Sequence, residues 1–406
     1  MVTAIHDDLF APEVIADPYT YFGHLREVDP VHWNDKYQAW IITRHDDLVW
    51  VARHHELFSS ELFTRDDRPP YPPIDEADRE LNNYVRAVGS NSFIRHDRPE
   101  HTEMRKVLHG YFNPKSMEAW RPLVQSAIQY LLDEAEARGE MDVMQDFATP
   151  LPLLVIAQMM GMPNQDRLFI RKLSKMLLAG GRAESNRMQA AAQGNRELRA
   201  YLAPLVEERL INPTDDLLSV VVSGEKNGVY TREEVLANAV LLLVAGHETT
   251  INLICNGTLA LLRHPEQWAL LQQDPAGRTQ RVTEECLRYD SPVKGIQRIA
   301  AEDVELRGRT IRQGDRTRWI ISSANRDPEM FLDPDMFDIT RWPNRHVAFG
   351  AGIHHCLGVT LARLEGQEVF KALAERLPSL RLVTEELAYH ATIGFRSLFS
   401  LPVTWN

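Results

Sequence analysis

Apolar side chains recur at three- and four-residue intervals through the middle of the chain, the spacing of helices that bury one face. Most windows between residues 99 and 289 follow this period. Loop signals interrupt it near Pro163, Gly180-Gly181 and Asn212-Pro213. The pattern therefore predicts a core made mainly of helices.

The first hundred residues predict shorter elements. A helix is expected to begin at Asp17-Pro18 and to run to Glu27, and residues 31–33 and 39–43 are expected to be strands. Residues 61–95 are rich in Pro, Asp and Arg, which predicts an irregular surface loop. This part of the chain is expected to mix short helices with strands.

The last hundred residues combine one predicted helix with two predicted hairpins. Residues 303–322 are expected to form a strand hairpin with turns at Gly308 and Gly314. Residues 359–374 follow the helical period, and residues 393–403 indicate a short terminal hairpin. Since no repeat or linker divides the chain, we expect a single domain over all 406 residues, of mainly α (α+β) class.

The composition permits a large core and excludes one class of partner. With 44% hydrophobic and 25% charged residues, the chain can bury a core large enough to enclose a cofactor. Its 45 basic and 57 acidic residues give a net charge of -12. A general nucleic-acid binder needs a basic face, so we expect no nucleic-acid partner.

Cysteine usage and apolar run length indicate the compartment. The three cysteines, Cys255, Cys286 and Cys356, are too few for a disulfide framework and indicate a reducing environment. Residues 1–10 lack the apolar region of a signal peptide. The longest run of apolar residues and glycine alone, residues 239–246, is too short to span a bilayer. We expect a soluble cytoplasmic protein with no membrane partner.

Residues 349–358, FGAGIHHCLG, carry the strongest chemical signal. The pattern F-G-x-G-x-[H/R]-x-C-x-G arises by chance in such a chain with a probability on the order of 10⁻⁵. Cys356 supplies a soft anionic ligand, and a thiolate on haem iron favours cleavage of the O–O bond. Gly350 and Gly352 permit a tight, partly left-handed turn around the sulfur, and Phe349 can shield the sulfur from water.

The helix predicted after Cys356 strengthens this interpretation. It places the thiol at a helix N-terminus, where unpaired amides and the helix dipole lower a thiol pKa. A lone cysteine is more often buried and inert. That alternative does not explain the pattern of residues around Cys356. A dinucleotide-binding loop would need a third glycine where His355 stands.

A second signal lies in the apolar helix predicted over residues 241–250. Ala245 and Gly246 leave room for a diatomic ligand, and Thr249 can donate a hydrogen bond to the carbonyl at 245 and locally open the helix. Glu248 is an acid that can relay protons inward. Taken alone, the segment fits a buried core helix with a packing glycine better; the cysteine loop favours the functional interpretation.

Four basic residues are candidates to bind carboxylates. His101 and Arg105 share one face of a helix that is expected to begin at Pro99. Arg298 and His354 add two further donors, and the planar fork of arginine suits a carboxylate. Haem carries two propionates, whose burial requires paired donors. The alternative for the first pair alone is an exposed, charged helix face.

Glu285 and Arg288 lie three residues apart on a predicted helix and can therefore pair on one face. About one such E-x-x-R pair is expected by chance in a chain of this size. The pair is weak evidence alone, and we expect its role to be structural.

These segments together resemble the cytochrome P-450 family of haem-thiolate monooxygenases, specifically the soluble bacterial type. The resemblance runs nearly end to end, because it also includes Asp17-Pro18-Tyr19, Arg98-Pro99-Glu100-His101-Thr102 and residues 324–328. It implies a triangular, mainly helical prism with a small β-rich region.

The resemblance implies roles at matching positions. Cys356 is expected to be the axial ligand of haem b, and Thr249 and Glu248 are expected to deliver protons. Other residues expected to bind the haem are His101, Arg105, Arg298, His354, Phe349, Gly350, Ala245 and Gly246. A structural charge triad is expected from Glu285, Arg288 and Arg341. The chain departs from the family's pattern at Arg98, where proline is common, and at Glu248, where some members have aspartate.

The implied reaction is reductive activation of O₂ and insertion of one oxygen atom, by hydroxylation or epoxidation, into a small, largely apolar organic substrate. The chain carries no flavin, nicotinamide or iron–sulfur fingerprint. Electrons are therefore expected from a ferredoxin or flavodoxin with an NAD(P)H-dependent reductase. Because the net charge would repel an acidic ferredoxin, we expect a basic docking face on the cysteine side, made of Arg98, Lys106, His109, Arg345, His355 and Arg363.

By the same resemblance, the substrate pocket is expected to be lined by Val244, Val293, Lys294, Ile296 and Phe395. Lys294 can pair a substrate carboxylate there, although a solvated lysine is the commoner case.

Two other functions stay open. A peroxygenase or isomerising haem-thiolate enzyme needs no electrons, and the pair of Glu248 and Thr249 argues against it. A haem-based gas sensor or haem carrier would not turn over; no effector domain is evident in the sequence, which disfavours it.

Overall fold

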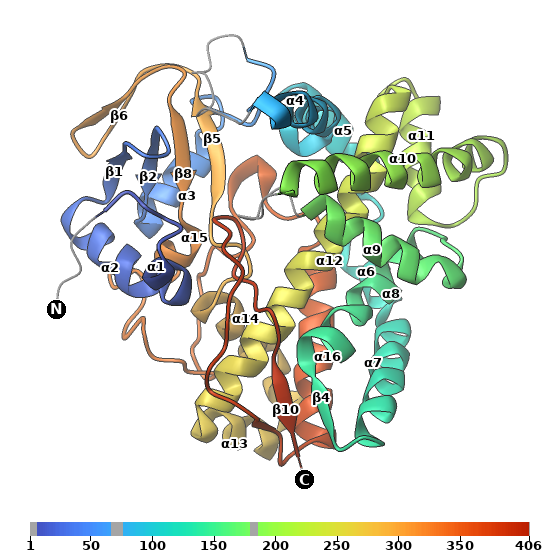
Figure 1. The fold of residues 1–406 in the computed structure, drawn as a ribbon, viewed down its shortest axis with the longest axis vertical. Helices are drawn as coiled ribbons and strands as arrows, with labels where there is room; N and C mark the ends of the chain where they lie inside the picture. Colours follow the sequence, from blue (N-terminus) through green and yellow to red (C-terminus); the bar gives the residue numbers. More distant parts are fainter. Residues whose placement is uncertain (1–5, 66–75, 179–185, 406) are drawn as a thin grey trace.

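The structure is a computed structural model that describes residues 6–65, 76–178 and 186–405. Long helices fill one side of the molecule, and the largest sheet lies at the other side (Figure 1). The described α-helices are α1 (Pro12–Ala16), α2 (Pro18–Val28), α3 (His45–Arg53), α4 (Glu76–Ser90), α5 (Glu100–His109), α6 (Pro114–Glu118), α7 (Arg121–Glu136), α8 (Pro150–Met159), α9 (Arg167–Leu178), α10 (Arg187–Ile211), α11 (Leu217–Lys226), α12 (Arg232–Arg263), α13 (Pro265–Gln273), α14 (Pro275–Tyr289), α15 (Ile321–Ala324) and α16 (Val359–Arg376). The short 3₁₀ and π turns are η1 (Phe93–Arg95), η2 (Val143–Ala148), η3 (Asn164–Asp166) and η5 (Gly352–His354).

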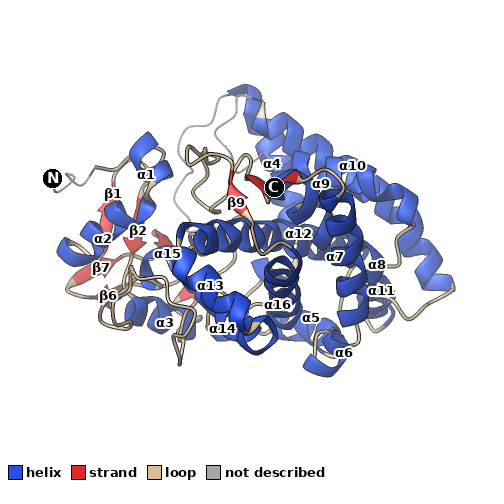
Figure 2. Cartoon of the chain, turned by 90° about the horizontal axis from the view of Figure 1, so that it is seen from below, coloured by secondary structure: helices blue, strands red, loops and turns tan. Residues whose placement is uncertain are grey.

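The longest helix, α12, crosses the centre of the fold (Figures 1 and 2). A capping box begins it, because Glu234 N donates to Thr231 Oγ1 and Thr231 N donates to Glu234 Oε2. By length and composition α12 is apolar enough to cross a membrane, but 78% of its apolar window is buried inside the fold. Helices α8, α10, α11, α14 and α16 pack against it. It is therefore the central core helix.

Strands from both ends of the chain join in one sheet. The strands are β1 (Val31–Asn34), β2 (Ala39–Ile42), β3 (Phe58–Ser59), β4 (Glu140–Asp142), β5 (Ile296–Ala300), β6 (Val304–Leu306), β7 (Arg309–Ile311), β8 (Arg316–Trp319), β9 (Arg381–Leu382) and β10 (Pro402–Thr404). The largest sheet has the order β1-β2-β8-β5-β3, in which only β2 and β8 are parallel. A second sheet has the order β4-β10-β9, and β6 pairs with β7. A separate apolar cluster packs behind the largest sheet.

Most of the predicted elements are confirmed within one or two residues. The early helix and strands match α2, β1 and β2, and the helix after Cys356 matches α16. The loop signals at Pro163 and Asn212-Pro213 fall between α8 and α9 and between α10 and α11. Gly180-Gly181 lies outside the described residues. The mainly helical class is confirmed, whereas the single-domain organisation stays a prediction.

The surface loop predicted over residues 61–95 is wrong for its second half, which forms helix α4. Leu81, Tyr84, Val85 and Val88 recur at helical spacing, and α4 packs against α10. The dense charges before this stripe concealed it, because they resemble loop composition.

The hairpin predictions are right in kind but wrong in extent. β6 and β7 form a hairpin with Gly308 in the turn at φ 74°, but the following strand, β8, joins the largest sheet instead. Near the C-terminus an isolated bridge pairs Leu398, inside the predicted hairpin of residues 393–403, with Tyr389, which lies before it. β10 pairs instead with β4 and β9. In both cases a strand pairs with a strand outside the predicted hairpin, which the local sequence does not reveal.

Candidate functional site

Residues 349–358 form a compact loop directly before α16. Cys356 N donates a hydrogen bond to Phe349 O at 2.9 Å, which closes the loop. Gly350 and Gly352 both adopt φ 70°, as the left-handed turn predicted here requires. Because α16 begins at Val359, Cys356 lies just before its N-terminus.

Gly352 also brings the loop against α3. A Cβ at this position would lie 1.9 Å from the Ala52 carbonyl oxygen, whereas a Cβ at Gly350 would meet nothing within 4 Å. Two glycines with the same backbone angle therefore have different constraints. Of the two glycines, only Gly352 packs so closely against α3 that no side chain fits.

The Cys356 thiol is not made more acidic overall. Burial raises its pKa, and this outweighs the hydrogen bond from the Gly358 amide and the positive charges of Arg105 and Arg363, which lower it. The expected lowering of the pKa by the helix N-terminus is therefore wrong in net direction, because desolvation of the thiolate is the larger effect. A bound metal ion deprotonates a coordinating thiol, so the loop suits a soft metal centre.

Three basic side chains from α5, β5 and the cysteine loop meet beside this loop. His101 is 1% exposed, and its ring centroid lies 4.2 Å from that of His354. The Arg298 guanidinium lies 5.4 Å from the ring centroid of Trp319. Burial, with repulsion from Arg105, lowers the pKa of His101 to about 4. Burial, with repulsion from Arg298, lowers the pKa of His354 to about 2.

No described carboxylate is hydrogen-bonded to or ion-paired with this cluster of basic side chains. Both ring nitrogens of His101 and Nδ1 of His354 are buried without hydrogen-bond partners. Within the described ranges neither Arg105 nor Arg298 pairs with a carboxylate; Arg105 Nη2 instead donates to His355 O at 2.6 Å. Unpaired buried charges are costly, so the cluster fits a ligand that brings carboxylates of its own. The two propionates of a haem satisfy this requirement.

Helix α12 carries the residues that were predicted to bind oxygen and deliver protons. Thr249 Oγ1 donates to Ala245 O at 2.8 Å, as expected. The predicted local opening is not seen, because α12 stays continuously α-helical through this point. Ala245 is exposed although Val244 and His247 beside it are buried, so this turn of α12 borders a crevice. Gly246 and Glu248 are half-buried.

The sequence interpretation missed a line of polar side chains that continues along α12. Asn252 and Asn256 follow Thr249 at intervals of three and four residues, so all three share one face. Both amide atoms of Asn252 and Oδ1 of Asn256 are buried without partners. Asn256 Nδ2 donates to Arg396 O at 3.0 Å. Buried amides of this kind require ordered water. Two asparagines at helical spacing within an apolar segment were the signal in the sequence that could have revealed these buried polar groups.

Glu365 on α16 is a second buried group that the sequence interpretation missed. It is 1% exposed, and Thr250 Oγ1 donates to its Oε2 at 3.2 Å. Burial raises the pKa of this carboxyl group to about 8. It is therefore largely neutral at pH 7. No local sequence signal distinguishes it from the exposed acids of a helix.

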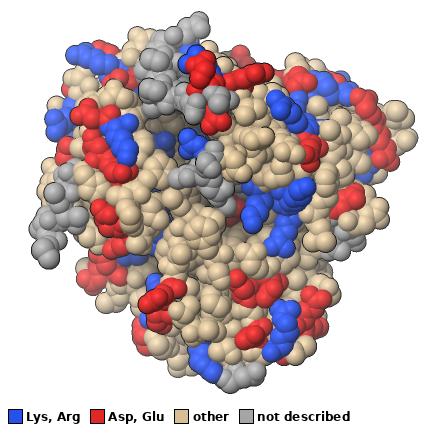
Figure 3. Space-filling view, in the orientation of Figure 1, with Lys and Arg blue, Asp and Glu red and all other residues tan. Residues whose placement is uncertain are grey.

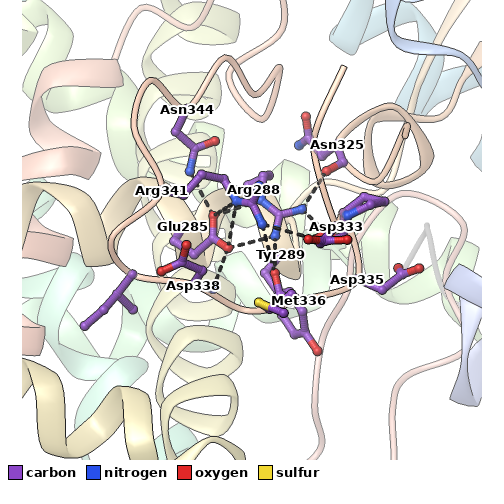
Figure 4. A network of polar contacts seen from close by, with 12 residues as sticks. Glu285, Arg288, Tyr289, Asn325, Asp333, Asp335, Met336, Asp338, Arg341 and Asn344 are labelled. Atoms are coloured by element: carbon purple, nitrogen blue, oxygen red, sulfur yellow. Dashed lines mark hydrogen bonds and ion pairs between the residues drawn. The ribbon is translucent and has the colours of Figure 1, made fainter. Parts of the chain in front are cut away.

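Glu285 and Arg288 form the predicted pair inside the core (Figure 4). Both side chains are completely buried, with Arg288 Nε 2.8 Å and Nη2 2.7 Å from the two Glu285 oxygens. Arg341 joins at 3.3 Å, as the triad prediction expected. Arg288 also donates to backbone carbonyls, which belong to Asn325, Pro334 and Met336.

The same network uses groups that the prediction lacked. Asn344 Nδ2 and Asp338 N both donate to Glu285 at 2.9 Å. Asn325 Oδ1 accepts a hydrogen bond from Val347 N at 2.7 Å, just before the cysteine loop. Next to Glu285, Glu284 forms a bidentate pair with Arg363 of α16. α14 is therefore bound to the chain on both sides of Cys356.

The predicted pocket residues come from two segments that lie side by side. Val293 and Phe395 form an isolated β-bridge, and Lys294 N donates to Gly394 O at 2.8 Å. Val293, Ile296 and Phe395 are all half-buried. The expectation of a solvated Lys294 is wrong, because the residue is 6% exposed and burial lowers its pKa to about 7. Its pairing with a substrate carboxylate stays a prediction.

The contact between the cysteine loop and α3 generates a first prediction. Gly352→Ala should prevent the loop from closing, because its Cβ would overlap a backbone carbonyl that cannot rotate away. Gly350→Ala is the matched control, with the same φ and no overlap. We expect the first variant to lose haem in the purified protein and the second to retain most of it. Equal haem content, measured by absorbance, would contradict this.

Removal of one partner from a buried pair leaves the other charge unpaired. Arg288→Met should therefore lower the free energy of unfolding by about 3–5 kcal/mol. Arg341→Met, at the edge of the same network, should cost about 1–2 kcal/mol. Denaturant unfolding monitored by circular dichroism measures both, and a similar loss in the two variants would refute this ranking.

Glu365 generates a pH-dependent prediction. Its folded pKa of about 8 lies above the value of 4.5 for an exposed glutamate, so the folded state holds a proton that the unfolded state releases. Stability from this group is present below pH 4.5 and is lost as pH rises toward 8. Glu365→Gln should therefore unfold at a higher denaturant concentration than wild type at pH 8, with a smaller difference at pH 5. Parallel pH profiles for the two proteins would disprove the buried, protonated state.

The fold and site are similar to those of characterised proteins. The family description "Cytochrome P450" matches residues 74–383. The "Biotin biosynthesis cytochrome P450" of Bacillus subtilis strain 168 is 35% identical, over 97% of this chain and 98% of its own.

Two solved structures show the same fold over nearly the whole chain. One is P450BioI in complex with an acyl carrier protein ligated to hexadec-9Z-enoic acid, with a TM-score of 0.87 and 34% identity over 97% of this chain and 99% of its own. The other is the myxobacterial CYP267B1 in complex with myristic acid, with a TM-score of 0.88 and 33% identity over 98% of each chain. By its cysteine loop, its fold and its relatives, this chain belongs to the cytochrome P450 family of haem-thiolate monooxygenases, whose cofactor is haem b.

Proposed function

We propose that this chain inserts one oxygen atom from O₂ into a largely apolar acyl chain, by hydroxylation or epoxidation. The buried cation cluster beside the cysteine loop carries the proposal, because its orphaned donors match a dicarboxylate ligand lying next to a metal-binding thiol. The two acyl-bound structural neighbours support an acyl chain as substrate.

Each group at the site takes one task in this proposal. Cys356 binds the haem iron, with Phe349 and Gly350 forming the wall of the sulfur loop. Arg105, His101, Arg298 and His354 hold the propionates. Haem supplies the reductive activation of O₂ when it is bound.

The chain's own residues position the oxygen and supply protons. Ala245 leaves space on the exposed side of α12, whereas a Cβ at Gly246 would pack 3.6 Å from Ile156 of α8. Thr249 keeps its hydroxyl at the crevice through its hydrogen bond to Ala245 O, and Glu248 replenishes the proton that this hydroxyl delivers. Neither an electron-independent peroxygenase nor a sensor would need this pair of residues for proton delivery.

Val244, Val293, Ile296 and Phe395 would form the apolar wall that holds the substrate. Val244 belongs to α12, Val293 and Ile296 to the segment that leads into β5 and its first residue, and Phe395 to the terminal hairpin. Apolar contact from three separate segments excludes water from the reacting carbon and favours a hydrocarbon chain over a polar group.

Family members use separate redox partners, and for this chain we propose a ferredoxin or flavodoxin with its NAD(P)H-dependent reductase. The docking face expected on the cysteine side includes Arg98, His109, Arg345 and His355, which are all exposed. Lys106 pairs with Glu103, and Arg363 pairs with Glu284, so these two contribute less free charge than expected. A cytoplasmic location, where such partners occur, stays a prediction.

Reconstitution tests the proposal directly. Purified protein, reduced and exposed to CO, should show the absorption band of a thiolate-ligated haem, and Cys356→Ser should lose it. With a surrogate ferredoxin, its reductase and NADPH, palmitic acid should yield an oxygenated product. Absence of any acyl product in protein with normal CO binding would leave a sensor or carrier as the better interpretation.

The proton relay generates a separate prediction. Thr249→Ala should still consume NADPH but convert less of it into product and release more hydrogen peroxide, because the hydroxyl that delivers protons is gone. We expect about a tenfold or larger loss of product per NADPH. Thr258→Ala, a buried threonine two turns further along α12, is the matched control and should keep wild-type coupling. Unchanged coupling in the Thr249 variant would refute the relay.

A further inference from the structure

Helix α9 is basic in a chain that is acidic overall. Its sequence, RLFIRKLSKMLL, contains four basic residues and no acidic residue, whereas the whole chain has a net charge of -12. Lys172 and Lys175 are exposed. Leu168 is also exposed, by 77%, together with Phe169 beside it. Exposed apolar groups bordered by charged residues are typical of a protein-interaction surface.

Three cations of α9, Arg171, Lys172 and Lys175, form no ion pair with a described residue. Lys172 and Lys175 form no ion pair with any described residue, and Arg171 Nη2 donates only to the neutral amide of Gln145, at 3.1 Å. Elsewhere on the surface an exposed cation does pair with an acid, as Arg312 does with Asp303. The positive charge of α9 is therefore available to a partner.

This surface is linked by hydrogen bonds to the terminal hairpin, which carries one residue of the proposed pocket wall. Gln145, which accepts from Arg171, also donates to Phe399 O at 3.5 Å. Phe399 is half-exposed and belongs to the terminal hairpin that carries Phe395 of the proposed pocket wall. Lys and Arg side chains gather over α9 on the same face as a hollow in the region between β5 and α4 (Figure 3). The basic surface and the hollow can therefore be used by one partner at the same time.

We infer that the α9 surface, made of Leu168, Phe169, Arg171, Lys172, Lys175 and Phe399, docks a small acidic carrier protein that delivers the substrate as a thioester. The inference rests on the proposed function, since it names how the acyl chain arrives. Acidic side chains on the carrier pair with the three cations, its apolar contacts cover Leu168 and Phe169, and the acyl chain enters the hollow. Charge complementarity of this kind speeds association and sets the partner's orientation.

A redox protein is the other acidic partner that this enzyme needs. The α9 surface is linked through Gln145 to the terminal hairpin, whereas the redox face expected on the cysteine side uses a separate set of cations. An electron donor gains nothing from docking beside the substrate entrance. The carrier is therefore the occupant that the position of α9 favours.

The test compares carrier-bound with free substrate on the holoenzyme. Dissociation constants are measured from the spectral shift of the haem with palmitoyl acyl carrier protein, palmitoyl-pantetheine and palmitic acid. Lys172→Glu combined with Lys175→Glu should weaken binding of the palmitoyl carrier protein about tenfold or more and leave the other two constants within about twofold. Added salt should weaken only the carrier complex of the wild type.

The matched control reverses two exposed lysines elsewhere, Lys115→Glu with Lys226→Glu, and should bind the carrier as wild type does. Unchanged carrier affinity in the α9 variant would overturn the inference, as would equal wild-type affinity for the carrier and pantetheine forms. Slower electron transfer from ferredoxin with normal carrier binding would instead assign α9 to the redox partner. Failure of the proposed function is distinguishable, because then no acyl form would shift the spectrum or be oxidised.

Discussion

The buried guanidinium of Arg288 is the interaction on which the rest of the site depends. A charge without solvent is tolerated only when every donor has a partner. Here Glu285 and three backbone carbonyls supply them. Because those carbonyls belong to the chain before the cysteine loop, satisfying one side chain on α14 fixes the path of that chain. The position of Cys356 follows from this path.

The haem crevice shows the opposite electrostatic arrangement. His101, Arg298 and His354 are brought together and form no ion pair with a described carboxylate, and the nearby Asp97 is hydrogen-bonded to Ser59 and Ser60. Burial and mutual repulsion depress the pKa values of the two histidines. The fold therefore stores an electrostatic penalty that an anionic ligand relieves, so cofactor binding and stability are coupled.

Local sequence patterns predicted those features whose cause is local. The glycines of the cysteine loop, the pairing of Glu285 with Arg288 and the bond from Thr249 to Ala245 each depend on a few neighbouring residues. Asn252 and Asn256 were missed although they did have a local signal in their helical spacing within an apolar segment. Glu365 was missed because its significance is burial, which neighbouring residues do not encode. Lys294 was misjudged for the same reason: packing of the terminal hairpin against it, not its own type, removes it from solvent.

By itself the sequence determined the helical class, the thiolate loop and the family, since helical periodicity and a rare ten-residue pattern are properties of short segments. Only the tertiary structure decided the net pKa of Cys356, the extent of the hairpins and the unneutralised surface of α9. Each of these depends on distant segments, because desolvation, strand pairing and charge balance are set by whatever packs nearby. The residue types of a segment are fixed by its own sequence, whereas its burial and the charges around it depend on the folding of the whole chain.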